Sequence, residues 1–527
     1  MGDRYDFETL LAYYASGKLC KPDIQRGYVW ADKKAPQLLE SLYRSYPIGM
    51  LLLWEPPNSQ HLIELKEQKG LKNPTLAIID GQQRLTALHL IKTKKIPVIF
   101  NWETEKFDLE QPRLKGDQRW IRVSEIWDNS WNNHMYLRKF TSMKDEKKDT
   151  ISNKLHTVKN ILKIYPIIEY ITHDNYEEIT DIFIVLNKSA RPIKPDELLF
   201  AVGILKFPKY FGKQLKKLNT QYADWQMTSK KTGPNKFFIQ ALSCISTQQA
   251  KLKDPGETMK KYLYSTTESK IAKNFKNVEQ GLDYATQFLD DNIGINIKNN
   301  TKFLSSVYPV LSILNFLVKN KFALNEKEKV LLKLWTFVAL HHARFSHASE
   351  TTLNEDLRVL HQPNLKPEDV IKEWINEIKK EKGGLQVTQL GKGLNTSNYF
   401  TLFFALELSK AKDWFTGTSI RALQSIEFHH IFPRKVLKGK YEDSEINDPR
   451  NMAIISEKLN RKIRDTPPQT YFRDKSLIQN NIYTQFIPKD QTLLEIKNYK
   501  MFLEKRGELI KKEINKYIKT QEKKFKL

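Results

Sequence analysis

Residues 427–462 read EFHHIFPRKVLKGKYEDSEINDPRNMAIISEKLNRK, and this stretch decides how the C-terminal part of the chain folds. It places the pair His429-His430 two residues before a proline, and it continues to two asparagines, Asn451 and Asn460. A neutral imidazole can take a proton from water, while a second imidazole and an amide oxygen can hold a divalent cation. The pattern therefore predicts a one-metal centre that cleaves phosphodiester bonds.

The order of the segments predicts a hairpin followed by a helix, the arrangement of a ββα-metal unit. We expect His430 to act as the general base, because a neutral imidazole titrates near working pH. His429 precedes it on the strand, points to the opposite face and can ligate the metal, and Asn460 completes the protein's share from the helix. Asn451 is expected to support the hairpin and to orient the base. Basic residues that can flank the substrate phosphates are Arg434, Lys435, Arg461 and Lys462.

A second chemical motif lies near the N-terminus, where residues 76–88 read LAIIDGQQRLTAL. The pattern predicts a strand, a tight turn and the start of a helix, whose free N–H groups suit a phosphate. Gly81 lets the backbone approach closely and Arg84 can grip phosphate oxygens, while Asp80 can hold magnesium or orient water. Gln82 and Gln83 can position the water or a ribose.

The alternative for this motif is a plain strand-to-helix turn, with Asp80 as the helix N-cap and Arg84 on a solvated face. The upstream segment DIQRGYVW, with Gln25, Arg26 and Trp30, adds a second basic and aromatic element and favours the phosphate interpretation.

The composition is that of a globular protein with an excess of positive charge. The 527 residues allow two to four domains, and the formal net charge is +25. Such an excess attracts nucleic acid, although an AT-rich genome also yields a lysine-rich chain. Cys20 and Cys244 exclude a disulfide framework and a CxxC zinc site within the chain. No apolar run reaches the length of a membrane helix and no signal peptide is evident, so a cytoplasmic location is expected.

Three regions are predicted along the chain. Residues 1–200 mix strands and helices, with helices over 6–16, 33–46 and 82–91 and strands over 50–54, 76–79 and 98–102. Residues 201–385 are almost wholly helical, and glycine-containing segments at 383–384 and 391–393 mark a linker. Residues 386–527 hold the histidine motif and a basic C-terminal helix over 493–524. The fold class is multi-domain α+β.

For several other features, the sequence favours a structural role over a functional one. His341-His342, with His347 nearby, resembles a metal cluster, but core or helix-end histidines are expected there. The tryptophans and tyrosines of residues 102–136 can stack a base, and a packed core is favoured. The C-terminal lysines are expected to be a solvated helix face, with DNA backbone tracking as the alternative. The histidine pair alone is also compatible with a hydrogen-bonded hairpin that buries one imidazole.

Four motifs in the first 200 residues resemble those of the N-terminal domain of GmrSD-type restriction enzymes. They are QRGYVW, YPIGMLLLW, IIDGQQRLTAL and FIVLNKSARPIKPDELL, in that order. The resemblance implies a DGQQR-type module similar to the ParB/sulfiredoxin fold, which binds and hydrolyses nucleoside triphosphates. The nucleotide-binding residues that it implies are Gln25, Arg26, Asp80, Gly81, Gln82, Gln83, Arg84 and Asn187. Asp80 and Arg84 would also serve hydrolysis, and Gly27 stands where the family has proline.

The C-terminal segment resembles the HNH nuclease domain of the same enzymes. HHIFP matches closely, NMAII stands for the NL element and Asn460 takes the distal position, whereas Arg450 replaces the family's glycine. The resemblance implies catalysis by His430 and Asn451 and a metal site of His429 and Asn460, with Glu427 as the alternative to His429.

Together the two resemblances imply an NTP-regulated DNA endonuclease of the type IV, modification-dependent class. We expect it to use Mg²⁺ or Mn²⁺, to bind a nucleoside triphosphate and to cleave double-stranded DNA, with modified phage DNA as the target. A homodimer would supply two nicking centres. The alternatives are a nucleotide-sensing DNA-binding regulator with an inactive nuclease fold and a toxin-like ribonuclease. The nucleotide, the DNA modification and the choice between nicks and double-strand breaks do not follow from the sequence.

Overall fold

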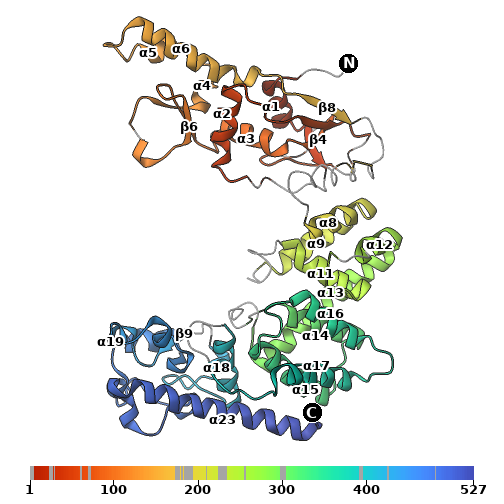
Figure 1. Ribbon diagram of the computed structural model, residues 1–527, viewed down its shortest axis with the longest axis vertical. Coiled ribbons are helices and arrows are strands. Elements are labelled where there is room, and N and C mark those ends of the chain that lie inside the picture. Colours follow the sequence, from red (N-terminus) through yellow and green to blue (C-terminus); the bar gives the residue numbers. More distant parts are fainter. Residues whose placement is uncertain are drawn as a thin grey trace. The chain divides into compact units, whose positions relative to one another are not determined.

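The structure is a computed structural model of the 527-residue chain (Figure 1). It describes all residues except 1–4, 23–27, 29, 58, 60–61, 69, 71–72, 115, 172–177, 180–181, 183–193, 209, 224–233, 254–256, 297–303, 305, 391–395, 424–426 and 481. The chain divides into two compact units, Met1–Gly212 and Lys213–Leu527. The sequence predicted two region boundaries, at residues 200 and 385, whereas the structure divides once, after residue 212. Within the described part of the chain, no helix is long and apolar enough to cross a membrane.

The first unit is built on a five-stranded mixed sheet in the order β3-β1-β4-β2-β8. Its strands are β1 (Leu19–Pro22), β2 (Leu51–Trp54), β3 (Leu62–Ile63), β4 (Leu76–Asp80) and β8 (Ile168–Ile171). β4 runs parallel to β1 and antiparallel to β2, so it lies at the centre of the sheet. The helices that share its apolar core are α1 (Phe7–Ser16), α2 (Lys34–Tyr43) and α3 (Gln82–Lys92).

A smaller three-stranded sheet of order β6-β5-β7 extends this core. It comprises β5 (Val98–Asn101), β6 (Lys106–Leu109) and β7 (Trp120–Arg122). The helical elements of the first unit that follow are η1 (Pro112–Leu114), α4 (Val123–Ile126), α5 (Asn133–Leu137), α6 (Asp145–Asn160), η2 (Ile161–Lys163) and α8 (Pro195–Lys206). The predicted strands and helices of this region are confirmed to within three residues at each end.

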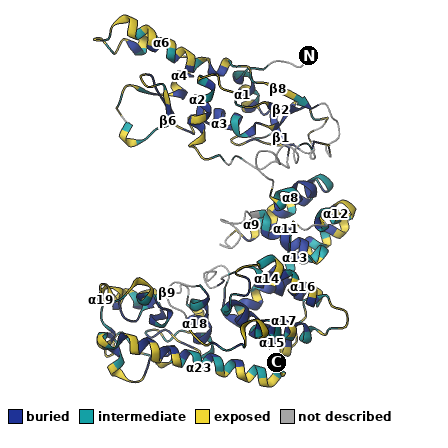
Figure 2. Cartoon of the chain, viewed as in Figure 1, coloured by how far each residue is buried: buried dark blue, intermediate teal, exposed yellow. Residues whose placement is uncertain are grey.

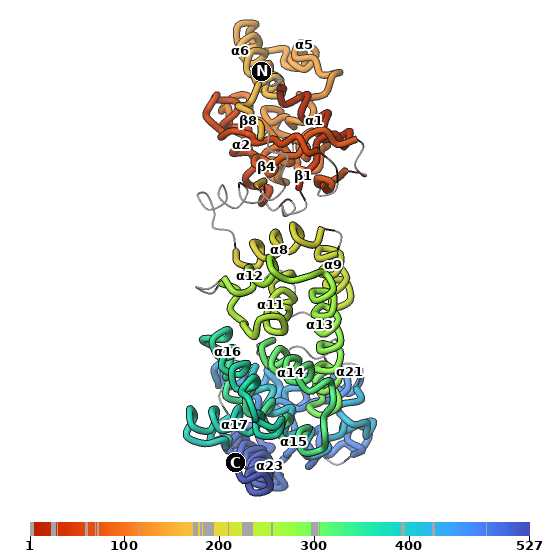
Figure 3. The backbone as a smooth tube through the Cα atoms, turned by 90° about the vertical axis from the view of Figure 1, so that its right-hand side faces the viewer, coloured from red at the N-terminus to blue at the C-terminus, as the bar shows by residue number. Residues whose placement is uncertain are grey.

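The second unit begins with a helical region, as predicted. Its elements are α9 (Phe211–Gln221, which starts in the first unit), α11 (Pro234–Thr247), α12 (Thr258–Ser265), α13 (Glu268–Phe288), η3 (Leu289–Ile293), α14 (Tyr308–Lys319), α15 (Glu326–His341), α16 (Ser349–Leu360) and α17 (Pro367–Lys382). α13 packs on α14 and α15 packs on α17 (Figure 3). A buried ion pair, Arg344 with Asp356 at 2.8 Å, lies inside this bundle.

The C-terminal part of the second unit surrounds a two-stranded hairpin. Its elements are α18 (Thr396–Leu408), η5 (Ile420–Ala422), β9 (Glu427–His430), α19 (Arg434–Leu437), α20 (Asp443–Ile446), η6 (Pro449–Asn451), β10 (Met452–Ile455), α21 (Glu457–Ile463), α22 (Pro468–Tyr471), η7 (Ile482–Gln485), η8 (Gln491–Leu494), η9 (Ile496–Asn498) and α23 (Tyr499–Phe525). The hairpin, α21, α22 and the first turns of α23 share one apolar core. The expected basic helix therefore starts later than residue 493, after two short 3-10 turns.

Candidate active site

The predicted hairpin forms from β9 and β10, which pair antiparallel. His430 lies opposite Met452 and His429 lies opposite Ala453. All four residues of β10 are buried, which follows from its continuous apolar sequence MAII. α21 starts directly after β10, with Ser456 as its N-cap. The hairpin and the helix are thus arranged in the order that the sequence predicted.

His429 and Asn460 meet at the junction of β9 and α21. The Nδ1 atom of His429 lies 2.9 Å from Oδ1 of Asn460, although the two residues are 31 positions apart. Burial lowers the pKa of His429 to about 4, so its imidazole is neutral at pH 7. An amide oxygen can only accept, so Nδ1 of His429 carries the proton of this hydrogen bond. The bond brings together the two side chains of the predicted metal site, and Nδ1 can ligate a cation only in the tautomer that carries the proton on Nε2.

The environment of His429 keeps its ring in place. Only 3% of the residue is exposed, and the rings of Trp414 and Tyr471 stand edge-on to it at 6.2 and 5.7 Å. Its Nε2 atom is buried and has no hydrogen-bond partner among the described residues. No group of three or more His, Cys, Asp or Glu side chains suited to a metal occurs in the described part of the chain. One imidazole and one amide fit a site whose other ligands are water and the substrate phosphate.

His430 is half-buried, and Asn447 contacts it. Its Nε2 atom lies 3.0 Å from Oδ1 of Asn447, and the amide nitrogen of Asn447 donates to the carbonyl oxygen of Asp443 at 2.9 Å. A carbonyl oxygen can only accept, so the amide orientation of Asn447 is determined and its oxygen faces the imidazole. Nε2 of His430 must then carry the proton, and Nδ1 keeps the free lone pair. This is the state that a general base requires.

The charge state of His430 also suits a base. Burial lowers its pKa, the hydrogen bond that it donates to Asn447 raises it and the positive charge of Arg434 lowers it. The imidazole is therefore neutral near pH 7 and can accept a proton. Asn447 was not singled out in the sequence. The signal that would have identified it is its position at the end of a short helix, four residues after the Asp443 carbonyl that holds its amide.

Asn451 is fully buried and supports the hairpin, as predicted. Its Oδ1 accepts from the N–H of Phe432 at 2.9 Å, and its Nδ2 donates to the carbonyl oxygens of Phe432 at 3.1 Å and Ile446 at 3.0 Å. These bonds hold the HHIFP segment against the loop before β10. The predicted orientation of the general base by Asn451 differs from the geometry, because the side chain that reaches His430 is that of Asn447.

Three buried polar side chains that the sequence did not indicate brace this site from behind. The carboxylate of Asp413 accepts from the N–H of Ser456 at 2.6 Å. Gln485 pairs with both backbone groups of Ile454, at 2.9 and 2.6 Å, and so completes the outer edge of β10. Arg506 of α23, which is fully buried, donates to the carbonyl oxygens of Arg450 and Gln485. Contacts between residues so far apart in the chain produce no periodic sequence pattern from which they could be predicted.

The basic residues around the site are exposed and weakly paired. Arg434 lies 3.1 Å from Asp443 and Lys435 lies 3.8 Å from Asp465. Arg461 pairs with Glu457 on α21, and Lys462 stands over the ring of Phe415 at 4.4 Å. Exposed ion pairs contribute only about 0–1 kcal/mol, so a phosphate can replace the carboxylate partner at little cost. The predicted role of these residues at substrate phosphates is compatible with their placement.

The DGQQR segment in the first unit forms the predicted strand, turn and helix start. Gly81 has a φ of 94° and is the N-cap of α3, so Asp80 is not the cap that the simpler alternative required. A Cβ at Gly81 would meet Cδ2 of Leu51 at 2.2 Å, which leaves room only for glycine. The side chain of Asp80 is 56% exposed and available to a ligand.

Gln82 and Gln83 lie in the first turn of α3. Gln82 is only 7% exposed, and its amide nitrogen has no hydrogen-bond partner among the described residues. A buried donor without a partner is costly, and a bound acceptor would satisfy it. The Oε1 atom of Gln83 accepts from the N–H of Trp30 at 3.2 Å and so connects α3 with the segment that carries the upstream motif.

Arg84 is mostly buried, and its guanidinium forms hydrogen bonds within the first unit. Its side chain is 12% exposed and donates to the carbonyl oxygens of Ile48 and of Met50 (2.8 Å) and to the carboxylate of Asp80 (2.9 Å). These bonds use three of the five guanidinium N–H groups, so two remain for a phosphate. The simpler alternative of a solvated arginine is wrong, and Arg84 braces the chain that leads into β2. Gln25, Arg26 and Asn187 lie outside the described residues.

The histidines His341 and His342 contact the protein interior rather than forming a metal cluster. Nδ1 of His341 lies 2.8 Å from Oγ1 of Thr401, and burial lowers its pKa to about 3. Nε2 of His342 lies 3.4 Å from the carbonyl oxygen of Leu385. Both are helix-end histidines in contact with the protein interior, as expected, and His347 is exposed.

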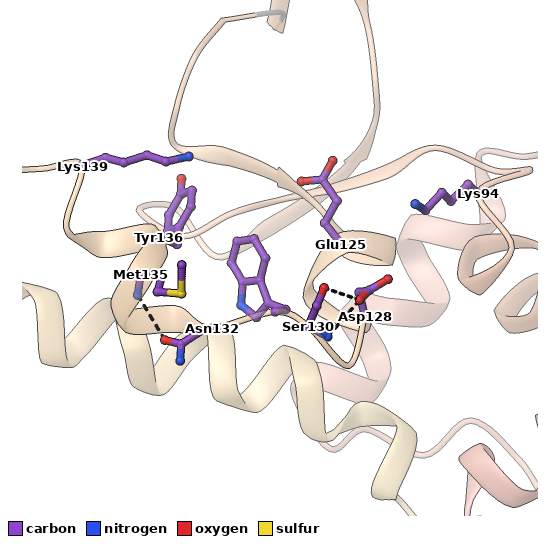
Figure 4. A pocket seen from close by; sticks show the side chains of 9 residues that line it. Lys94, Glu125, Asp128, Ser130, Asn132, Met135, Tyr136 and Lys139 are labelled. Atoms are coloured by element: carbon purple, nitrogen blue, oxygen red, sulfur yellow. Dashed lines mark hydrogen bonds between the residues drawn. The ribbon is translucent and has the colours of Figure 1, made fainter.

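The aromatic segment 102–136 divides into two parts. Trp102 and Trp127 belong to the apolar core of the first unit, which confirms the packed-core interpretation for them. Trp131 and Tyr136 are partly buried against the same core and also line an open cavity of about 430 Å³ (Figure 4). Their rings lie 5.2 Å apart, and the indole N–H is bound to Asn133 at 2.7 Å.

Comparison with known proteins supports the N-terminal resemblance. Residues 7–202 match the family described as GmrSD restriction endonuclease, N-terminal domain. The chain is also similar to an uncharacterized protein of Methanocaldococcus jannaschii, MJ0686, with 24% identity over 509 residues that cover 88% of this chain and 86% of that protein. The first unit thus resembles a GmrSD-type N-terminal domain, and this match suggests a restriction-endonuclease type of defence protein that binds DNA.

Proposed function

We propose that this chain is a metal-dependent DNA endonuclease that cuts with the β9–β10 hairpin and α21, and that a nucleoside triphosphate bound by its N-terminal domain controls the cut. The observations that carry the proposal are the 2.9 Å hydrogen bond between His429 and Asn460 and the neutral imidazole of His430, the next residue on β9. The match of residues 7–202 to a restriction endonuclease domain supports DNA as the substrate. The biological role is anti-phage defence, with modified foreign DNA as the target.

His430 begins the reaction by taking a proton from water. Its Nδ1 lone pair accepts the proton while the N–H on Nε2 stays bound to Asn447. The oxygen of that water then bonds to phosphorus, the bond from phosphorus to the 3′-oxygen breaks, and the 3′-oxygen takes a proton from solvent. The products are a 5′-phosphate and a 3′-hydroxyl.

We expect His429 and Asn460 to hold Mg²⁺ or Mn²⁺. The bound ion supplies charge neutralisation at the scissile phosphate and at the departing oxygen. The low pKa of His429 keeps its imidazole neutral, as a ligand must be, even in mildly acidic solution. Exposed Arg434 and Lys435 would contact the phosphates on either side of the cut.

The N-terminal domain would bind the triphosphate at the start of α3. The helix N-terminus, capped by Gly81, carries partial positive charge, and two guanidinium N–H groups of Arg84 remain for the phosphate. The buried amide of Gln82 gives a further donor. Asp80, which is exposed, would hold a magnesium ion of the nucleotide or orient the attacking water during hydrolysis.

The test is cleavage of phage and plasmid DNA, modified and unmodified, with Mg²⁺ and each triphosphate. His430→Ala and Asn460→Ala should abolish cleavage, whereas His347→Ala, the matched change of an exposed histidine, should not. Asp80→Ala should remove the nucleotide dependence and triphosphate hydrolysis. Wild-type cleavage by His430→Ala would overturn the site assignment, and cleavage of RNA in preference to DNA would favour a toxin-like ribonuclease. Tight DNA binding without any cleavage would favour a regulator.

A further inference from the structure

The long C-terminal helix α23 has two opposite faces (Figure 2). One face is buried at intervals of three and four residues, and its members are Tyr499, Phe502, Leu503, Arg506, Gly507, Ile510, Ile514 and Ile518. The opposite face carries four exposed lysines, Lys512, Lys516, Lys519 and Lys523, which we term the lysine face. Their spacing of four, three and four residues aligns them along one side of the helix.

The lysine face is unneutralised. None of its four ammonium groups has an acidic partner within the described part of the chain, whereas Lys500 and Lys505 earlier in the helix pair with Glu445 and Glu508. The acidic Glu522 is half-buried and points elsewhere, where it pairs with Lys379 at 2.9 Å. From residue 512 to residue 526, every exposed position of the chain is lysine or threonine.

The helix is held rigidly against the nuclease fold. Tyr499 donates its hydroxyl to the carbonyl oxygen of Glu445 at 2.7 Å, and Asn515 forms two hydrogen bonds with the backbone of Val387 at 2.8 and 3.0 Å. The four lysines are therefore presented in a straight row. At 1.5 Å per residue the row is about 16 Å long, and a DNA duplex carries roughly ten phosphate charges over that length.

We propose that the lysine face binds the sugar-phosphate backbone of duplex DNA without regard to sequence, and that it holds the substrate of the nuclease site in the same unit. The inference rests on the proposed function, since it assigns the duplex as the polyanion. A row of lysines without exposed apolar side chains suits an extended anion rather than a membrane surface, which would require apolar anchors. Lysine is a point charge that positions phosphates and reads no bases.

The test is the salt dependence of DNA binding by the full-length protein. A labelled 30-base-pair duplex is titrated in EDTA at several salt concentrations, and binding is followed by fluorescence anisotropy. Combined substitution of the lysine face (Lys512→Gln, Lys516→Gln, Lys519→Gln and Lys523→Gln) should lower the slope of log K against log salt by about 3–4, because each phosphate contact adds about 0.9. Between 50 and 200 mM salt, the wild-type protein should lose about a hundredfold more affinity than this variant.

The matched control makes the same charge change elsewhere in the same unit. Lys261, Lys270, Lys273 and Lys276 of α12 and α13 are exposed and have no acidic partner among the described residues. Their combined change to glutamine should alter the slope by less than about 1. Equal effects of the two variants, or an unchanged slope in the lysine-face variant, would overturn the proposal. An unchanged slope would also be expected if the lysine face bound an acidic protein instead of DNA.

The experiments distinguish a failure of the lysine-face proposal from a failure of the nuclease proposal. His430→Ala should cut nothing and keep the wild-type slope, because it removes the base and leaves the lysine face intact. If the wild-type protein cuts DNA but the lysine-face variant keeps its slope, only the lysine-face proposal fails. If the wild-type protein cuts no DNA but the variant loses slope, only the nuclease proposal fails.

Discussion

Replacement of Asn447 by alanine tests whether a hydrogen bond sets the proton position of His430, the proposed general base. The 3.0 Å contact with Nε2 of His430 would be lost, and the imidazole could then place its proton on either nitrogen. A hydrogen bond of this kind contributes about 0.5–1.5 kcal/mol net, and 1.36 kcal/mol corresponds to a tenfold change in rate. We therefore expect Asn447→Ala to lower kcat for DNA cleavage about three- to tenfold, with little change in KM.

The assay is steady-state cleavage of a labelled duplex with Mg²⁺, and the control is Asn320→Ala. Asn320 also follows the last residue of a helix and donates its amide to the carbonyl oxygen four residues earlier, at 2.8 Å, as Asn447 does at 2.9 Å. The control thus removes the same local bond far along the chain from His430. Equal kcat values for wild type and Asn447→Ala, or equal losses in both variants, would refute the reasoning.

A second variant, Asn447→Asp, separates the effect of Asn447 on the proton position of His430 from an effect on the pKa of His430. The carboxylate of Asn447→Asp can still accept from Nε2, so the lone pair stays on Nδ1 of His430. A negative charge nearby favours the imidazolium and raises the pKa of His430. Cleavage requires the neutral form, so activity should be lost at a higher pH than in the wild-type enzyme as the pH falls. A purely structural role of Asn447 would leave the pH profile unmoved.

Two further predictions concern stability. Gly81→Ala should destabilise the first unit by more than the about 1–2 kcal/mol that a positive φ alone costs, because its Cβ would meet Leu51 at 2.2 Å. Gly116→Ala, at a φ of 95° with no atom within 4 Å of the new Cβ, should cost only that amount in urea unfolding. The pKa of His341 is lowered to about 3 in the fold, so the unfolded chain binds its proton first and stability falls as the pH drops below about 6.5. Between pH 7 and 4.5 this costs about 2–3 kcal/mol, and His341→Gln should reduce that loss in denaturant titrations at the two pH values.

The sequence predicted the local geometry of both motifs because local patterns determine it. A continuous apolar strand, a proline and a capped helix place His429 and Asn460 in a hairpin-helix unit. In the same way, LAIIDG followed by leucines at helical spacing predicts the turn at Gly81, which the structure confirms. Arg450, where the family has glycine, does not have a positive φ, and its guanidinium binds the carboxylate of Asp448 at 2.7 Å, so this turn does not require glycine.

What the sequence did not predict depends on partners that are distant along the chain. Arg84 was expected either on phosphate or in solvent, yet it binds carbonyl oxygens 34 and 36 residues earlier. Gly49, beside those carbonyl groups, leaves 2.9 Å between a hypothetical Cβ and the guanidinium, so the segment YPIGM is shaped around Arg84. Neither residue type nor spacing reveals such a contact, because many sequences allow the same turn without it.

The position of Arg506 determines how the role of α23 can be tested. Its guanidinium is buried and binds the carbonyl oxygen of Arg450, immediately before Asn451, so the helix stabilises the hairpin of the proposed nuclease site. The lysine face lies on the opposite side of the same helix. Truncation of α23 would therefore remove DNA contacts and active-site support together, and a loss of cleavage would not distinguish them. Substitution of the exposed lysines leaves Arg506 and the apolar face intact, so a change in salt slope after that substitution reports on DNA contact alone.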